Sequence, residues 1–262
     1  YDGLASGLQP IGVKYDDASR KVVCTLEQDD IMDGLNWLHK WYQDGIINPD
    51  ANVVTDGGKG SIFGSAQGWP AAATTWAFNA GIEKYDLTPV LGPLYTTETI
   101  QGSMNAISAN SKYKTEALKV LQLMNTDSKF RDMCAYGTEG NYMEYAEDGT
   151  VQKLRDDWNW PSYTQGTFFI LSTQADGDPD AWNQVKEQNE SAVSSTCLGF
   201  ALDVTNIQNE IANCNTVWDK YKNDLLTGAS DPATAVPACI EELKAAGLDT
   251  VIEEAQKQVD EF

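Results

Sequence analysis

The chain has 262 residues, and its 39 Asp and Glu residues against 18 Lys and Arg give a formal net charge of −21 at pH 7. A field of this sign repels nucleic acid and anionic membrane surfaces, and no basic stripe offsets it. No stretch approaches the roughly 18 consecutive apolar residues of a membrane-spanning helix. The composition therefore excludes a nucleic-acid-binding protein and favours a globular protein whose ligand is neutral or cationic.

The five cysteines show no CxxC spacing, so neither a zinc ribbon nor a thioredoxin-type motif is supported. Their odd number leaves at least one thiol outside any intramolecular disulfide. Cys214 lies on an apolar helical stripe, which predicts a buried and inert thiol. The cysteines therefore leave the cellular compartment open.

The first half of the chain alternates short strand patterns with helices. Residues 12–26 predict a hairpin, and residues 29–45 predict a helix with Ile31, Leu35, Leu38 and Tyr42 on one face. Further strands are expected at 60–68, 86–94 and 102–110. The segment 112–125 predicts a helix with Ala117, Leu118, Leu121 and Met124 inward.

The tryptophan-bearing stretch at residues 68–78 has the sequence GWPAAATTWAF. Gly68 and Pro70 flank Trp69, which favours a turn, and small residues separate it from Trp76. Two interpretations stay open: the indoles fill a core, or they form an open wall against which a flat ligand lies. The tryptophans within helices, Trp37, Trp41 and Trp218, are expected to pack.

The middle of the chain, roughly 126–195, is less regular, whereas the last third is helical. Its longest helix places Ile207, Ile211, Cys214, Trp218, Tyr221 and Leu225 on one face. A Thr205/Gln208 capping box is expected to open that helix, and Asp249 is expected to cap the final one. Strands mixed with helices in this way predict an α/β domain.

The acidic segment DGDPDAWNQVKE, residues 176–187, is a weak metal-site candidate. Asp176, Asp178, Asp180 and Glu187 have the spacing of a calcium loop, but Ala181 stands where that loop needs Gly. The alternative is an acidic turn that leads into a helix with Pro179 at its first position. This second interpretation is favoured, so no metal and no cofactor are expected.

Catalytic motifs are equally sparse. The single histidine, His39, lies within a predicted helix and has no nucleophile in its sequence context, so a Ser-His-Asp or Cys-His arrangement is disfavoured. A glycosidase carboxylate pair stays open because its two members are usually far apart in the chain. We therefore expect a non-enzymatic protein, with a glycoside hydrolase fragment or a peptide or amino-sugar binder as alternatives.

The order of these segments resembles the extracellular solute-binding proteins of ABC importers. The resemblance is carried by KWYQDGIINPDA (40–51), SIFGSAQGWP, TTETIQGSMNAISANSKYKTEALKVLQLMNTD (96–127), YGTEGNYMEY (136–145), LGFALDV (198–204) and the last 38 residues, 225–262. The last segments are similar to the C-terminal region of a lipoprotein-type subgroup, tied to oligosaccharide uptake. Because the leader and most of an N-terminal lobe are not seen, the chain resembles a C-terminal half.

The resemblance implies a type II periplasmic-binding-protein-like α/β fold. Residues 1–104 and 198–262 would form one lobe, with a largely helical segment, 105–197, near the hinge and cleft. It also implies a binding protein that delivers an oligosaccharide to ABC permease transmembrane subunits and pairs with the missing N-terminal lobe. The location would be extracellular, on a lipoprotein anchored through a part outside this chain.

The resemblance also suggests which residues contact the ligand. In distant relatives an aromatic after the corresponding strand stacks on a pyranose, since an indole face covers the C–H side of a sugar ring. Glu139, Asn105 and Asp203 are chosen as polar partners because they lie near the ends of expected elements. The expected aromatic wall consists of Trp69, Trp76, Trp158, Trp160 and Tyr163.

The net charge generates a first prediction. At about 150 mM salt, the protein should flow through a heparin column and should not sediment with anionic vesicles, because its field opposes both polyanions. A neutral gel column of the same volume is the control. Retention on heparin at that salt would contradict the prediction.

Overall fold

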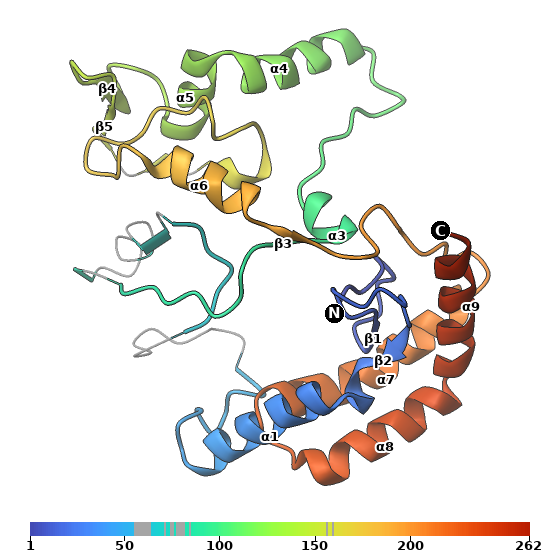
Figure 1. The fold of residues 1–262 in the computed structure, drawn as a ribbon. Helices are drawn as coiled ribbons and strands as arrows, with labels where there is room; N and C mark the ends of the chain where they lie inside the picture. Colours follow the sequence, from blue (N-terminus) through green and yellow to red (C-terminus); the bar gives the residue numbers. More distant parts are fainter. Residues whose placement is uncertain are drawn as a thin grey trace. The chain divides into compact units, whose positions relative to one another are not determined.

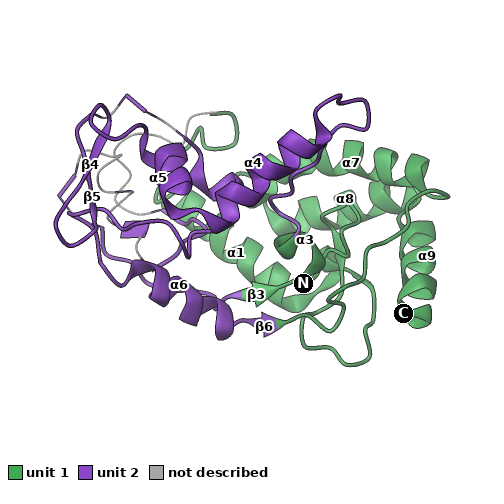
Figure 2. Cartoon of the chain, turned by 90° about the horizontal axis from the view of Figure 1, so that it is seen from above, with its two compact units in different colours: residues 1–60, 94–100, 194–262 green, residues 61–93, 101–193 purple. Residues whose placement is uncertain are grey.

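The computed structural model describes residues 1–54, 64–70, 72–73, 76, 82–83, 85–155, 157–158 and 160–262. The chain divides into two compact units, which Figure 2 shows in green and purple. Unit 1 comprises residues 1–60, 94–100 and 194–262, and unit 2 comprises residues 61–93 and 101–193.

This division differs from the expected lobe of residues 1–104 and 198–262, because residues 61–93 group with the middle of the chain. The expectation followed chain order. Between residues 61 and 193, only the short stretch 94–100 belongs to unit 1. There β3 (Leu94–Tyr95) pairs with β6 (Val193–Ser194), and the Ser195 N–H donates to the Tyr95 carbonyl at 2.8 Å.

Helices form most of unit 1. Figure 1 shows α1 (Asp29–Gln43), α7 (Gln208–Leu226), α8 (Pro232–Ala245) and α9 (Leu248–Glu261), and α7 contacts the other three. The predicted apolar face of α7 is confirmed, because Ile211, Cys214, Trp218 and Leu225 are at most 8% exposed. Their spacing of three, four and seven residues puts them on one helical face, which supplies the centre of the unit 1 core.

Cys214 is the buried thiol that its position on the stripe predicts. Its Sγ lies 3.7 Å from the Leu243 carbonyl oxygen, and burial raises the pKa of the thiol to about 11. Cys24, Cys134, Cys197 and Cys239 are free thiols as well.

Two helix starts differ from the predictions. The Thr205/Gln208 capping box is wrong: α7 has no side-chain cap, and the Thr205 hydroxyl donates to the Asp203 carboxylate at 2.5 Å instead. The final helix follows Gly247, which has a φ of 111°. Asp249 therefore lies in the first turn of α9 and not at its cap. In that turn its negative charge still interacts favourably with the helix dipole.

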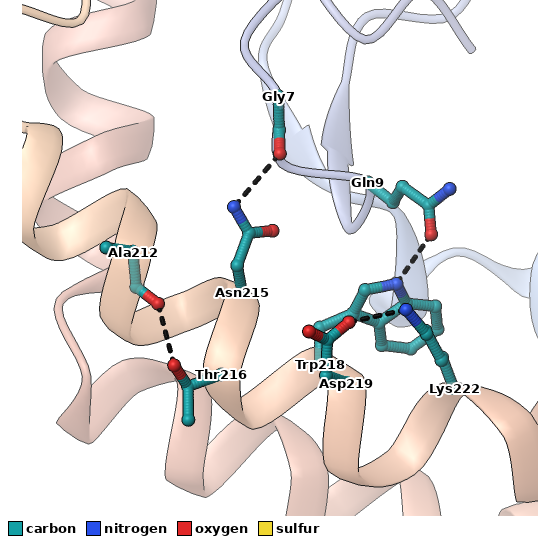
Figure 3. A network of polar contacts seen from close by, with 8 residues as sticks. All are labelled: Gly7, Gln9, Ala212, Asn215, Thr216, Trp218, Asp219 and Lys222. Atoms are coloured by element: carbon teal, nitrogen blue, oxygen red, sulfur yellow. Dashed lines mark hydrogen bonds and ion pairs between the residues drawn. The ribbon is translucent and has the colours of Figure 1, made fainter.

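The loop before β1 is tied to α7 by side-chain hydrogen bonds (Figure 3). The Asn215 amide donates to the Gly7 carbonyl at 3.0 Å, and the Trp218 indole N–H donates to the Gln9 side chain at 2.6 Å. Trp218 therefore packs as expected, with its one polar atom satisfied.

The two tryptophans of α1 behave differently from Trp218. Trp37 is 57% exposed, and its ring centroid lies 6.4 Å from that of Trp41. Both rings line an open groove of about 650 Å³ together with Leu226. The expectation that they pack is wrong, because both side chains stay exposed on this groove, which the buried Leu35 also lines.

The strands of the described residues are short. The predicted hairpin at 12–26 is confirmed as β1 (Ile11–Gly12) paired antiparallel with β2 (Val23–Cys24). Of the expected strand 60–68, residues 60–63 lie outside the described part, and residues 64–68, 85–93 and 104–108 form neither helix nor strand. A strand needs a neighbour for its backbone groups, and an alternating pattern does not provide one.

Unit 2 contains α4 (Lys114–Thr126), which packs on α5 (Ser128–Tyr136), then the hairpin of β4 (Met143–Tyr145) and β5 (Val151–Lys153), and α6 (Ala181–Glu190). Tyr136, Met143, Val151 and Leu171 form its core. The expected inward face of α4 is only partly right: Met124 is buried, whereas Leu118 is 60% exposed. Three further short elements occur in the described part of the chain: η1 (Thr25–Glu27) and α3 (Thr97–Ile100) belong to unit 1, and η2 (Ser162–Thr164) belongs to unit 2.

None of the described helices has the length and apolar character that a membrane crossing requires.

The close contact at Gly228 generates a stability prediction. Gly228 follows α7 with a φ of 77°, and an added Cβ would lie 2.2 Å from the Leu38 carbonyl oxygen. Gly228→Ala should therefore cost about 3 kcal/mol or more, from backbone strain plus displacement of α1. Urea denaturation measures the loss.

Gly45→Ala is the matched control, because Gly45 also has a positive φ, 73°, but nothing within 4 Å of an added Cβ. Backbone strain alone should cost it about 1–2 kcal/mol. Equal losses for the two variants would show that the contact with α1 is unimportant.

Candidate functional site

Trp69 and Trp76 contact one another in unit 2. Their ring centroids are 5.9 Å apart at an interplanar angle of 76°, an edge-to-face pair, and both side chains are half-buried. A Cβ added to Gly68 would lie 3.0 Å from the Trp76 ring, so the backbone passes close to that indole. Each indole covers part of its partner and leaves the rest of its surface to solvent. The pair is therefore neither a fully buried plug nor an open wall.

A second aromatic group, the Trp158 platform, consists of Tyr142, Arg155 and Trp158. The Tyr142 and Trp158 ring centroids lie 5.5 Å apart at 56°, and the Arg155 guanidinium lies 4.8 Å from the Tyr142 centroid. The Trp158 indole N–H donates to the Cys134 carbonyl at 3.0 Å, while 36% of the side chain stays exposed. The ring is thus fixed at its nitrogen and still available to a ligand.

A charged pair borders the platform. Arg155 donates to both carboxylate oxygens of Asp157, with an Nε to Oδ1 distance of 2.9 Å. This hydrogen bonding raises the pKa of Arg155 and lowers the pKa of Asp157. An exposed pair of this kind adds little stability, but it places donors and acceptors beside two aromatic faces.

Glu139 is carried by the turn that ends at Tyr142. Glu139 is exposed, and its backbone forms an isolated bridge with Met143. The turn begins at Gly137, whose φ is 91° and where an added Cβ would lie 2.5 Å from the Tyr142 Cβ. Glycine at this position allows Tyr142 to pack against the turn. Glu139 therefore lies in the same turn that positions Tyr142 of the platform.

Trp160 and Tyr163 follow the platform along the chain. Tyr163 lies in η2 and is 74% exposed, whereas Trp160 is half-buried and its carbonyl accepts a hydrogen bond from the Ser162 N–H at 2.8 Å. The segment from Trp158 to Tyr163 therefore presents two exposed aromatic side chains from one short stretch.

Helix α5 places a buried carboxylate behind this segment. Asp132 is 1% exposed and accepts hydrogen bonds from the Tyr145 hydroxyl at 2.9 Å, the Ser172 N–H at 2.8 Å and the Ser172 hydroxyl at 2.8 Å. Burial, with the hydrogen bond to Asp132, raises the pKa of Tyr145. A carboxylate with three donors and no exposure is structural, so it does not suit acid–base chemistry on a ligand.

The other two polar candidates, Asn105 and Asp203, belong to different units of the chain. Asn105 is exposed in the irregular stretch 104–108 of unit 2. Asp203 belongs to unit 1, where Thr205 donates to it from both hydroxyl and backbone, and these bonds lower the pKa of its carboxyl. Asp203 thus shapes the turn before α7.

The acidic turn leads into α6. Asp178 accepts hydrogen bonds from the Asp180 N–H at 2.9 Å and from a side chain of α6 at 2.7 Å. Pro179 was expected at the first helical position, but α6 begins two residues later. Asp176 and Glu187 are exposed, and no group of three metal-ligating side chains occurs among the described residues.

Sequence reasoning missed Tyr142 and Arg155. Tyr142 lies within the quoted segment YGTEGNYMEY, but the contact between Tyr142 and Trp158 depends on the turn at Gly137. The spacing Arg155-x-Asp157 is the only local signal of the charged pair, and it is too common to predict a site.

A family model and a known protein are similar to this chain in sequence. Residues 196–262 match the family model "Domain of unknown function (DUF3502)". A carbohydrate ABC transporter substrate-binding protein of Streptococcus pneumoniae serotype 4 is 26% identical over 99% of this chain, which spans 55% of that relative.

Solved structures extend the match. The N-glycan transport solute binding protein NgtS of Streptococcus pneumoniae superposes with a TM-score of 0.84 at 26% identity, over 98% of this chain and 59% of NgtS. Its complex with Man1GlcNAc gives the same TM-score. A solute-binding protein of Bifidobacterium longum infantis, at 14% identity and a TM-score of 0.50, shares the fold alone.

These matches confirm the resemblance to an oligosaccharide-linked solute-binding protein and the α/β fold class that it implied. The chain spans little more than half the length of the relatives it matches. The activity, ligand and partners of the whole protein are therefore matters for proposal.

The Trp69–Trp76 contact generates a prediction for a double-mutant cycle. Trp69→Ala and Trp76→Ala should not be additive in the free energy of unfolding, and the coupling should be about 0.5–1.5 kcal/mol, the scale of an edge-to-face pair. Urea denaturation of both single variants and the double variant measures it. Additive losses would contradict the contact.

Proposed function

We propose that the chain is part of the solute-binding component of an ABC importer and that it binds a neutral oligosaccharide. The Trp158 platform is the observation that carries the proposal. A half-exposed indole, a second ring at 5.5 Å and a bordering Arg155–Asp157 pair combine an apolar face with polar groups at its edge. A sugar ring offers the matching surface, with C–H groups on one face and hydroxyls around it.

Other candidate residues extend this surface. Glu139, on the same turn as Tyr142, has two oxygens that can accept sugar hydroxyls. Tyr163 and Trp160 continue the aromatic surface along the segment, while Trp69 and Trp76 form a separate aromatic pair for another part of the ligand. Asn105 remains a proposed contact, and the bonds of Asp203 within its own turn make it the weakest of the set.

The relatives support the ligand class. NgtS is described in complexes with Man1GlcNAc and with Man5GlcNAc, and the chain resembles both complexes over at least 98% of its length. We infer that a mannose- and N-acetylglucosamine-containing glycan is the first ligand to test. Capture would shift the protein towards a closed state in which both sides of the site contact the glycan.

The hydrolase alternative has less support. The matched relatives are described as transporter substrate-binding proteins, and the buried Asp132 already accepts three hydrogen bonds. Product analysis after incubation with Man1GlcNAc should therefore show intact glycan. Delivery to ABC permease subunits and an extracellular, lipid-anchored location complete the proposal by analogy with this class of protein.

The proposal predicts that Trp158→Ala weakens Man1GlcNAc binding by about 1–3 kcal/mol, the scale of a lost aromatic contact at a binding site. Calorimetric titration measures the affinity. The free energy of unfolding should fall far less than the roughly 3–5 kcal/mol expected for a core tryptophan, since the side chain is partly exposed.

Trp37→Ala is the matched control, because Trp37 is an exposed tryptophan of α1, outside the platform. It should leave the affinity unchanged. The reverse result, with Trp37→Ala weakening binding and Trp158→Ala neutral, would move the site to the groove on α1. Unchanged affinity in both variants would refute the platform.

A further inference from the structure

Residues 157–172 carry exposed aromatic side chains of the proposed site but contain little regular structure. Within the described part of this stretch, η2 is the only helical element and no strand occurs. Backbone groups outside helices and sheets need other hydrogen-bond partners when they are buried. The direction in which Trp158 and Tyr163 point therefore depends on what holds this backbone.

Arg131 of α5 holds the middle of the segment. Its side chain is fully buried, with Nε donating to the Thr167 carbonyl at 3.1 Å and Nη2 donating to the Ser162 carbonyl at 2.8 Å. The guanidinium also lies 5.5 Å from the Phe168 ring centroid. Arg131 thus joins two carbonyls that are five residues apart, one of them next to Tyr163.

The fit around this guanidinium is close. Gly166 has a φ of 76°, and an added Cβ would lie 2.9 Å from the Arg131 Nε and 2.8 Å from the Met124 carbonyl oxygen. The loop backbone therefore passes directly over the guanidinium. A side chain at position 166 would push the two apart.

The ends of the segment are held by the same helix. The Cys134 carbonyl accepts the Trp158 indole N–H, and the Asp132 carboxylate accepts the Ser172 N–H. The Tyr136 hydroxyl donates to the Ser172 carbonyl at 2.7 Å. Helix α5 therefore contacts the segment at its start, middle and end.

The energetics make Arg131 sensitive to the shape of the segment. A buried guanidinium loses its hydration, and here its acceptors are carbonyls and an aromatic face. The planar fork of arginine donates in two directions from one rigid group, which an ammonium cannot reproduce. Nη1 is buried with no hydrogen-bond partner among the described residues, so the two bonds offset only part of the cost of burial, and only while both carbonyls stay within reach.

We infer that Arg131 is a positioning residue of the oligosaccharide site: it fixes the backbone at Ser162 and Thr167 and so sets the presentation of Tyr163 and Trp158. The inference rests on the proposed function, because it assigns Arg131 a role in the affinity of that site. Arg131 itself is buried and does not touch the ligand.

Arg131→Met tests the inference, because it keeps a long side chain and removes both donors. Hydrogen exchange of the amides in residues 160–172 should become roughly tenfold faster or more, since local opening no longer breaks two hydrogen bonds. Calorimetric affinity for Man1GlcNAc should fall roughly tenfold for the folded protein. Lys129→Met is the control: it removes one exposed positive charge from the same helix and should change neither quantity.

Arg131→Lys covers the case in which the Met variant fails to fold. It keeps the positive charge but reaches one carbonyl at most. Amide exchange in residues 160–172 should therefore rise and affinity for Man1GlcNAc should fall, each by less than in Arg131→Met. If a folded Arg131 variant loses stability but keeps wild-type affinity, Arg131 is structural only and the inference is overturned.

The same measurements distinguish a failure of the proposed function from a failure of the inference about Arg131. If the wild-type chain binds no oligosaccharide, the proposed function and the ligand role of Arg131 both fall. Hydrogen exchange in Arg131→Met then still tests whether Arg131 fixes the backbone of this segment. Faster exchange confined to residues 160–172 supports that claim, and unchanged exchange overturns it. If the wild type binds and exchange is unchanged in Arg131→Met, only the inference about Arg131 falls.

Discussion

Buried backbone that lies outside helices and sheets must find its hydrogen-bond partners in side chains or in other irregular backbone, and this constraint governs both units. The described strands span two or three residues each, so most non-helical backbone has no sheet neighbour. In unit 1 the Asp2 carboxylate accepts the Leu4 N–H at 2.9 Å; in unit 2 Asp132 does the same for Ser172. Leaving such groups unpaired would cost about 1–3 kcal/mol each. A few buried polar side chains thereby define the irregular segments.

The same constraint explains how a loop can hold a rigid aromatic surface. A tryptophan on a mobile loop would lose conformational freedom on binding, and that cost would reduce affinity. Here the Trp158 nitrogen is bonded to α5, and the Tyr142 ring is seated against the Gly137 turn. Each ring therefore has a contact within the protein that restricts its orientation. At the proposed site, hydrogen bonds to helix α5 would therefore take the place of the sheet edge that usually positions ligand contacts in α/β folds.

The helices were predictable because their information is local. The spacing of Ile211, Cys214, Trp218 and Leu225 defines the buried face of α7 without reference to any other segment. Met124 and Leu118 show what the helical pattern leaves undecided. Both fit the apolar stripe of α4, but Met124 is buried and Leu118 is exposed. Burial is decided by what covers a face, and one helix's pattern does not contain that information. Most of the expected strands at 86–94 and 102–110 is irregular for the same reason, because pairing needs a neighbour elsewhere in the chain.

The candidate site was only partly predictable. Trp158, Trp160 and Tyr163 stand out as a cluster of aromatic residues, and Glu139 as an acid in a glycine-flanked turn. The contact between Trp158 and Tyr142 spans 16 residues and depends on the positive φ of Gly137, which a pattern of side chains does not reveal. Asp203 shows a different limit: both hydrogen bonds from Thr205 go to its Oδ1 and shape the turn before α7, a local role that its position in the sequence did not reveal.

The charge of the platform adds a last constraint. Arg155 is cationic in a chain of net charge −21, but its pairing with Asp157 cancels the local charge. The remaining field disfavours anionic ligands, while the paired groups still supply donors and acceptors, so a neutral polyhydroxyl ligand meets no electrostatic penalty at this surface.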